Sequence, residues 1–153
     1  MPTDAELMEA SLAAAADGPE LRHALFARFF NAFPDRGASF INLDAASRRM
    51  TDETLGMMLG IAKGEENWVW PFASEMVATH INFGSLPAQE FLAWIDITID
   101  TLGEAAGAAW CAECEAAWRR SGERLKTMIL EAREGWDRAM PGEVFKVDGR
   151  ISS

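Results

Sequence analysis

Two histidines occur in this chain of 153 residues, and one of them, His80, has the surroundings of a ligand. It closes the apolar stretch 68–79, which carries two tryptophans and a phenylalanine and which we expect to be helical. An Ile-Asn-Phe-Gly segment follows, and Pro87 can then begin another helix. A histidine in such a place is often a core residue with an internal hydrogen bond. The aromatic and helical pattern before it favours a second interpretation, a ligand of haem iron.

Other residues that could bind a metal carry a weaker signal. His23 lies one turn before Phe26, no spacing rule selects it, and we expect a surface or interhelical residue. Cys111 and Cys114 form Cys-Ala-Glu-Cys in an Ala-rich segment. A zinc site needs two more ligands, the chain has no third cysteine, and a redox pair usually begins a helix that follows a strand. We therefore expect two reduced thiols about one turn apart on a helix.

Composition narrows the class of protein. Hydrophobic residues make up 49% of the chain and charged residues 25%, so a single domain over residues 1–153 can bury a core without disulfides. The net charge of −10 disfavours nucleic acid and anionic membranes, because phosphate binding requires a basic patch. The acidic start lacks a signal-peptide pattern, and no apolar run reaches the roughly 18 residues of a membrane span. We expect a cytoplasmic protein with neither nucleic-acid nor membrane partners.

The elements that must position these residues all read as helices. Thr3 or Asp4 can cap the first, Asp44 the third, and Pro71 and Pro87 can begin the fourth and fifth. Residues 95–100 alternate like a strand, but no partner strand is visible, so the helical interpretation is preferred. Gly103 should end the fifth helix. The predicted helices are 4–16, 19–32, 45–62, 71–80, 87–103 and 106–134, followed by a loose C-terminal tail at 140–153.

This order of helices resembles a globin. The segment from Phe26 to Pro34, with Phe40 six residues later, resembles globin helix B and the turns that follow it. Asp44 and Met50 resemble the start of helix E and its distal position, and the segment around His80 resembles helix F with the proximal histidine. The likeness covers nearly all of residues 4–134 and is greatest to single-domain bacterial globins and the haem domain of flavohaemoglobins. It implies an all-α globin fold, a three-over-three sandwich of about six to eight helices.

The resemblance also implies roles for individual residues. His80 would bind the iron of haem b as the proximal ligand. Phe40 would stack on the haem edge, and Phe26, Met50 and Thr54 would line the distal side. Further packing on the proximal side and at the edge would come from Met76, Phe83 and Leu125. Arg48 or Arg49 could pair with a haem propionate, and Glu90 is a weak candidate to hold the second nitrogen of the imidazole.

The sequence departs from the globin pattern on the distal side. Oxygen-binding globins usually place a histidine or glutamine on helix E, often with a tyrosine on helix B, whereas this chain has Met50 and Phe26 there and no tyrosine at all. A buried donor is worth on the order of 1–3 kcal/mol, or about tenfold to over a hundredfold in affinity. We therefore expect fast oxygen loss, easy autoxidation and a relative preference for carbon monoxide and nitric oxide. Thr54 is the one weak donor foreseen.

These residues imply reversible binding of a diatomic gas (oxygen, carbon monoxide or nitric oxide) at a His80-ligated haem. No reductase segment is recognised, so electrons would come from an external reductase. Two alternatives remain open. One is a haem-free globin-like sensor or interaction module that binds another apolar ligand or a protein. The other is a haem enzyme with weak peroxidase or nitric-oxide-consuming activity, which is disfavoured because Phe26 and Met50 offer no acid–base group.

Overall fold

The helical architecture predicted from the sequence is confirmed. The computed structural model describes residues 1–16, 20–81 and 86–139, and over these ranges it contains six α-helices, two short 3-10 helices and no strand. Residues 95–100 are helical, as preferred above. The predicted tail at 140–153 lies outside the described residues. The elements are α1 (Asp4–Ala15), α2 (Glu20–Ala32), η1 (Pro34–Ser39), α3 (Leu43–Ala62), α4 (Glu66–Ile81), α5 (Ala88–Ala106), η2 (Gly107–Ala109) and α6 (Ala112–Ala139).

Short polar side chains fix the beginnings of the first and third α-helices. Thr3 caps α1 in a capping box, in which its hydroxyl accepts from the Glu6 N–H and the Glu6 carboxylate accepts from the Thr3 N–H. Helix α3 begins two residues earlier than predicted, because the Asn42 side chain accepts from the Ala45 N–H. The prediction of Asp44 as the cap is therefore wrong. Its carboxylate pairs instead with Arg22 of α2 at 3.0 Å.

Helix α4 begins at Glu66, five residues before the predicted start at Pro71. The extra turn is held by tertiary contacts that the local pattern does not reveal. Val69 is fully buried in it, and Arg124 of α6 donates two hydrogen bonds to the Glu66 carboxylate at 2.9 and 3.0 Å. This bonding holds the pKa of Glu66 below its ordinary value. Pro71 is the sixth residue of α4, past the first turn, so the helix lacks the backbone bond that an N–H at this position would donate to the Asn67 carbonyl.

The junction of the last two α-helices also differs from the prediction. Helix α5 continues past Gly103 to Ala106, and Gly107, with φ of 57°, ends it. Helix α6 then begins at Ala112 instead of residue 106. Gly103 is required for close packing, since a Cβ there would lie 2.9 Å from the Trp110 ring. The prediction that Gly103 ends the fifth helix is therefore wrong, and Gly107 ends it.

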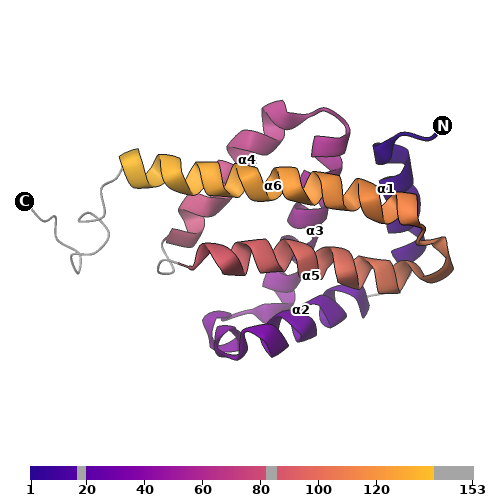
Figure 1. Ribbon diagram of the computed structural model, residues 1–153. Coiled ribbons are helices and arrows are strands. Elements are labelled where there is room, and N and C mark those ends of the chain that lie inside the picture. The colour runs from indigo at the N-terminus through magenta and orange to yellow at the C-terminus, as the bar shows by residue number, and fades with distance from the viewer. Residues whose placement is uncertain (17–19, 82–85, 140–153) are drawn as a thin grey trace, which may run out of the picture.

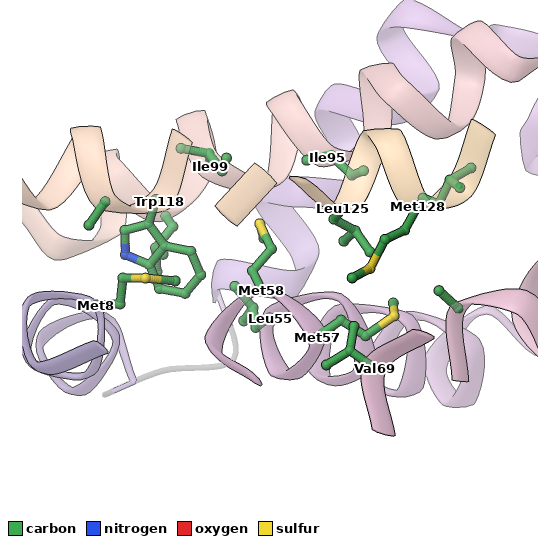
Figure 2. Close-up of a cluster of buried hydrophobic side chains, with 14 of the residues drawn as sticks. Met8, Leu55, Met57, Met58, Val69, Ile95, Ile99, Trp118, Leu125 and Met128 are labelled. Carbon is green, nitrogen blue, oxygen red and sulfur yellow. The ribbon is translucent and has the colours of Figure 1, made fainter. Parts of the chain in front are cut away.

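Helices α5 and α6 lie side by side, and α2 packs on α5 on the side away from α6 (Figure 1). Helices α1, α3 and α4 each contact α6 as well. The largest cluster of buried side chains, the main core, forms where these helices meet (Figure 2). In it Trp118 of α6 faces Met8 of α1, and Met58 of α3 lies toward Leu125 of α6. This arrangement leaves α2 to form a separate cluster with α5, on which Phe33 and Phe40, at the two ends of η1, and Met50 of α3 pack.

Candidate functional site

His80 lies in the last turn of α4 with its imidazole half-buried. Its Nδ1 is 2.8 Å from the carbonyl oxygen of Met76. A carbonyl only accepts, so Nδ1 carries the hydrogen and donates, which leaves the lone pair on Nε2. The ring also contacts Phe91 of α5 edge to face, with centroids 5.3 Å apart. The imidazole is thus oriented on two sides and held in the tautomer that a metal ligand requires.

The partner of the imidazole differs from the one suggested by the sequence. Glu90 does not contact His80 among the described hydrogen bonds. Its carboxylate is 7% exposed and receives two hydrogen bonds from the Arg36 guanidinium, at 2.5 and 2.8 Å. This pairing raises the pKa of Arg36. The suggestion of Glu90 is therefore wrong, and the carbonyl one turn earlier in the same helix takes that place.

Two of the predicted distal residues, Phe26 and Met50, and the predicted haem-edge residue Phe40 come together in one aromatic cluster between α2, α3 and α5. Phe26 is 3% exposed, and its ring meets those of Phe40 at 5.6 Å and Trp94 at 5.0 Å, both edge to face. Met50 packs against the same cluster from α3. Such edge-to-face pairs add to the burial energy and fix ring orientation. The cluster comprises Leu25, Phe26, Phe29 and Trp94, with Phe30, Phe33, Phe40, Met50 and Ile97 packed on it.

Two threonines of α3 are buried next to each other along the same helix face. The Trp94 indole donates to the Thr54 hydroxyl at 2.8 Å, which links the predicted distal threonine to the aromatic cluster. Thr51, 4% exposed, has a buried hydroxyl with no hydrogen-bond partner among the described residues. A buried polar group without a partner is unfavourable and calls for an explanation. The two hydroxyls thus differ: that of Thr54 accepts a hydrogen bond from Trp94, whereas that of Thr51 makes none among the described residues.

Isosteric substitution should separate these two hydroxyls. Thr54→Val removes the acceptor of a buried indole and should destabilise the fold by about 1–2 kcal/mol. Thr51→Val removes a hydroxyl that has no partner and should leave stability unchanged or raise it by up to about 1 kcal/mol. Urea unfolding of the two variants measures both changes. Equal losses in the two variants would mean that the Thr51 hydroxyl has a partner in solution.

The remaining predicted site residues lie elsewhere. Leu125 is fully buried in the main core, and Met76 packs against the same core. Phe83 lies outside the described residues. The predicted residues therefore fall into two groups: the distal set gathers around Trp94, whereas Met76 and Leu125 join α4 to α6. His80 contacts the second group through the Met76 carbonyl and through Phe91, which also packs on the main core.

No family model, curated protein or solved structure matches this chain. Its function has to be inferred from its own residues. In the described ranges, no three His, Cys, Asp or Glu side chains gather into a metal-binding group. None of the described helices combines the length and the apolarity that a membrane crossing requires.

The cations suggested as propionate partners are engaged with neighbours on their own helix. Arg48 pairs with Asp44 at 3.6 Å and Arg49 with Glu53 at 3.5 Å, one turn away in each case. A cation closer to the histidine environment is Arg133 of α6, whose guanidinium lies over the Phe91 ring at 5.7 Å and donates to the Leu86 carbonyl. Sequence reasoning missed it because the contact joins two helices distant in the chain.

Trp94 was also missed, although helical spacing could have found it. It lies four residues before the buried Thr98 on α5, so the two share a face. The predicted buried stripe lay on the other side of α5, where it includes Ile95 and Ile99, and Trp94 was not part of it. Helix α5 in fact buries two faces, one toward the main core and one toward the aromatic cluster. An amphipathic pattern alone predicts only one.

One groove in the described structure is excluded as a haem site. It has a volume of about 450 Å³ and lies between α2, α5 and α6. None of the predicted site residues lines it. Its charges are already paired, Arg28 with Glu104 and Arg119 with Asp100. A polar, self-paired groove offers no slot for a flat apolar ring.

Proposed function

We propose that this chain is a haem-binding protein of the globin kind that reversibly binds a diatomic gas, with His80 as the iron ligand. The observation that carries the proposal is the hydrogen bond from His80 Nδ1 to the Met76 carbonyl, which orients the ring and leaves Nε2 as a nitrogen ligand without a hydrogen-bond partner among the described residues. The all-helical fold and the grouping of Phe26, Phe40 and Met50 support it. The three-over-three helical sandwich is part of the same proposal.

The chain's own residues fit haem b in three respects. His80 supplies one neutral nitrogen ligand, and phenylalanine and methionine side chains supply apolar surface. Arg133 beside Phe91 is a suitable propionate partner, in preference to Arg48 and Arg49. When bound, haem would supply the iron that takes up oxygen, carbon monoxide or nitric oxide. The protein would hold it, exclude water and position the Thr51 hydroxyl, with electrons from a separate reductase.

Haem titration tests this proposal directly. The purified chain should take up one equivalent of haemin and develop a Soret band, and the His23→Ala variant should behave in the same way. His80→Ala should lose the histidine-ligated spectrum while keeping its helical circular dichroism. Failure of the wild-type chain to take up haem would overturn the proposal, as would an unchanged spectrum in His80→Ala.

The apolar distal side leads to a prediction for gas release. Phe26→Tyr would place a hydroxyl donor in the aromatic cluster and should slow oxygen dissociation by about tenfold to a hundredfold, the worth of one buried hydrogen bond. Phe30→Tyr is a matched control, since Phe30 lies one turn later on α2, contacts the rings of Phe26 and Phe40, and is only half-buried. Stopped-flow release of oxygen from the ferrous protein measures both. Equal rates in Phe26→Tyr and wild type would remove Phe26 from the distal side.

The second candidate is a haem-free globin-like module, which one observation favours. The Phe26 ring contacts the rings of both Phe40 and Trp94, so the aromatic cluster is already packed by its own side chains. A cavity that needs no cofactor could bind another apolar ligand or a protein. The haemin titration separates the two candidates, because this module would show no uptake. A haem enzyme is the least supported, since Phe26 and Met50 provide no acid–base group.

A further inference from the structure

The Cys-Ala-Glu-Cys segment lies at the beginning of α6, and not inside a helix as predicted. Gly107 ends α5, η2 turns the chain, and Cys111 directly precedes the first residue of α6. The Cys111 carbonyl accepts from the Glu115 N–H and its Sγ accepts from the Cys114 N–H at 3.2 Å. Cys111 therefore takes the position of a helix cap. This is the placement that favours reactive cysteine pairs.

The two thiols are in direct contact and differ in exposure. Cys111 Sγ and Cys114 Sγ are 2.7 Å apart, and both cysteines are free. Cys114 is 4% exposed, and its sulfur lies 3.8 Å from the Leu7 carbonyl of α1. Cys111 is half-buried and accessible to solvent. The Cys111 sulfur can thus react with a reagent from solution, and the Cys114 sulfur lies next to it. Little backbone movement is needed to join the two sulfurs in a disulfide.

We propose that Cys111 and Cys114 form a reversible dithiol–disulfide site whose oxidant is a low-molecular-weight disulfide. The Cys111 thiolate attacks one sulfur of the small disulfide, forms a mixed disulfide, and releases the first small thiolate, which takes up a proton. Cys114 then loses its proton to solvent and attacks Cys111 Sγ. The protein disulfide forms and the second small thiol leaves. Two protein thiols are oxidised and one small disulfide is reduced to two thiols.

The surroundings of the two thiols make their oxidation slow. A slow reaction suits a redox sensor or a reserve of reduced thiols better than a rapid oxidoreductase. The hydrogen bond with Cys114 raises the pKa of the Cys111 thiol, so little thiolate is present at neutral pH. The site therefore has to be tested at equilibrium. The proposal does not depend on haem, since no residue of the proposed haem site takes part in it.

The test uses the full-length chain in anaerobic glutathione buffers, followed by acid quenching, alkylation and intact mass spectrometry. We expect an unalkylated form two hydrogens lighter than the dithiol. The ratio of oxidised to reduced protein should rise tenfold for each tenfold rise in [GSSG]/[GSH]², the dependence of a two-thiol site. Dependence on [GSSG]/[GSH] with a stable glutathione adduct would overturn the proposal. So would full alkylation at every ratio.

Two single variants test the order of attack. Cys114→Ser should accumulate a glutathione adduct at Cys111, because no second thiol resolves it. Cys111→Ser should remain unmodified for longer, because Cys114 is buried. Reversal of this pattern would overturn the assignment of Cys111 as the sulfur that meets the oxidant. The wild-type measurement stands by itself if either variant fails to fold.

Discussion

Replacement of His80 by glycine should lower haem affinity by more than about 100-fold, since loss of an outer-shell partner alone lowers metal affinity by about 10- to 100-fold. The glycine variant also leaves space where the imidazole stood, beside Phe91. Free imidazole at millimolar concentration should enter that space and restore the histidine-type spectrum. Haemin titration with and without imidazole measures both effects.

His23→Gly is the matched control, because it removes the only other histidine of the chain. It should keep full haem affinity and should not respond to imidazole. Rescue separates loss of a ligand from loss of the fold, since imidazole cannot repair a misfolded chain. Unchanged affinity in His80→Gly would contradict the assignment of His80. An equal loss in His23→Gly would contradict it as well.

Removal of Arg36 should produce the largest loss of stability among the ion-pair variants. The Glu90 carboxylate is 7% exposed and is held by two hydrogen bonds from Arg36. Arg36→Ala would leave that charge buried without its partner, which costs about 3–5 kcal/mol. The loss should lie toward the lower end, because the Arg36 side chain is itself 32% exposed. Guanidinium unfolding followed by circular dichroism measures the change.

Two further variants show whether this loss comes from the uncompensated charge. The double variant Arg36→Met, Glu90→Leu should recover most of the stability, since apolar residues of similar volume often replace a buried pair without loss. Arg48→Ala breaks an exposed pair with Asp44 and should change stability by less than about 1 kcal/mol. A loss below about 1 kcal/mol in Arg36→Ala would contradict the burial of Glu90.

The Arg36–Glu90 pair also bears on the proposed site. Arg36 belongs to η1, which directly precedes Phe40, and Glu90 directly precedes Phe91, the ring that His80 contacts. The pair thus joins the segment that carries one predicted haem contact to the helix that orients the proposed ligand. Haem affinity in Arg36→Ala should fall along with stability.

Local patterns predicted which segments are helical but not all of their limits. Thr3, one of the two residues predicted as the first cap, acts locally, and the structure confirms it as the cap of α1. The start of α4 depends on Glu66 and its partner Arg124, 58 residues away, which no window of sequence reveals. Gly103 allows the Trp110 ring to pack closely against the helix, whereas Gly107 ends the helix. In the sequence both are simply glycines near the end of the same helical pattern.

The residues of the candidate site were predicted from the resemblance to a globin. Phe26, Phe40 and Met50 do meet in one cluster. The Met76 carbonyl as the partner of His80 was not foreseen, because backbone acceptors carry no residue signature. Thr51 was missed for a related reason: its hydroxyl is buried without a partner among the described residues, which depends on three-dimensional packing, whereas helical spacing could have revealed Trp94.

Resonance Raman spectroscopy of the ferrous, ligand-free haem complex tests iron ligation by His80 most directly. Labelling the histidines with ¹⁵N should shift an iron–histidine band, and only two histidines are present to assign. The band should persist in His23→Ala and disappear in His80→Ala. Absence of any ¹⁵N-sensitive band, or its survival in His80→Ala, would contradict a His80-ligated haem.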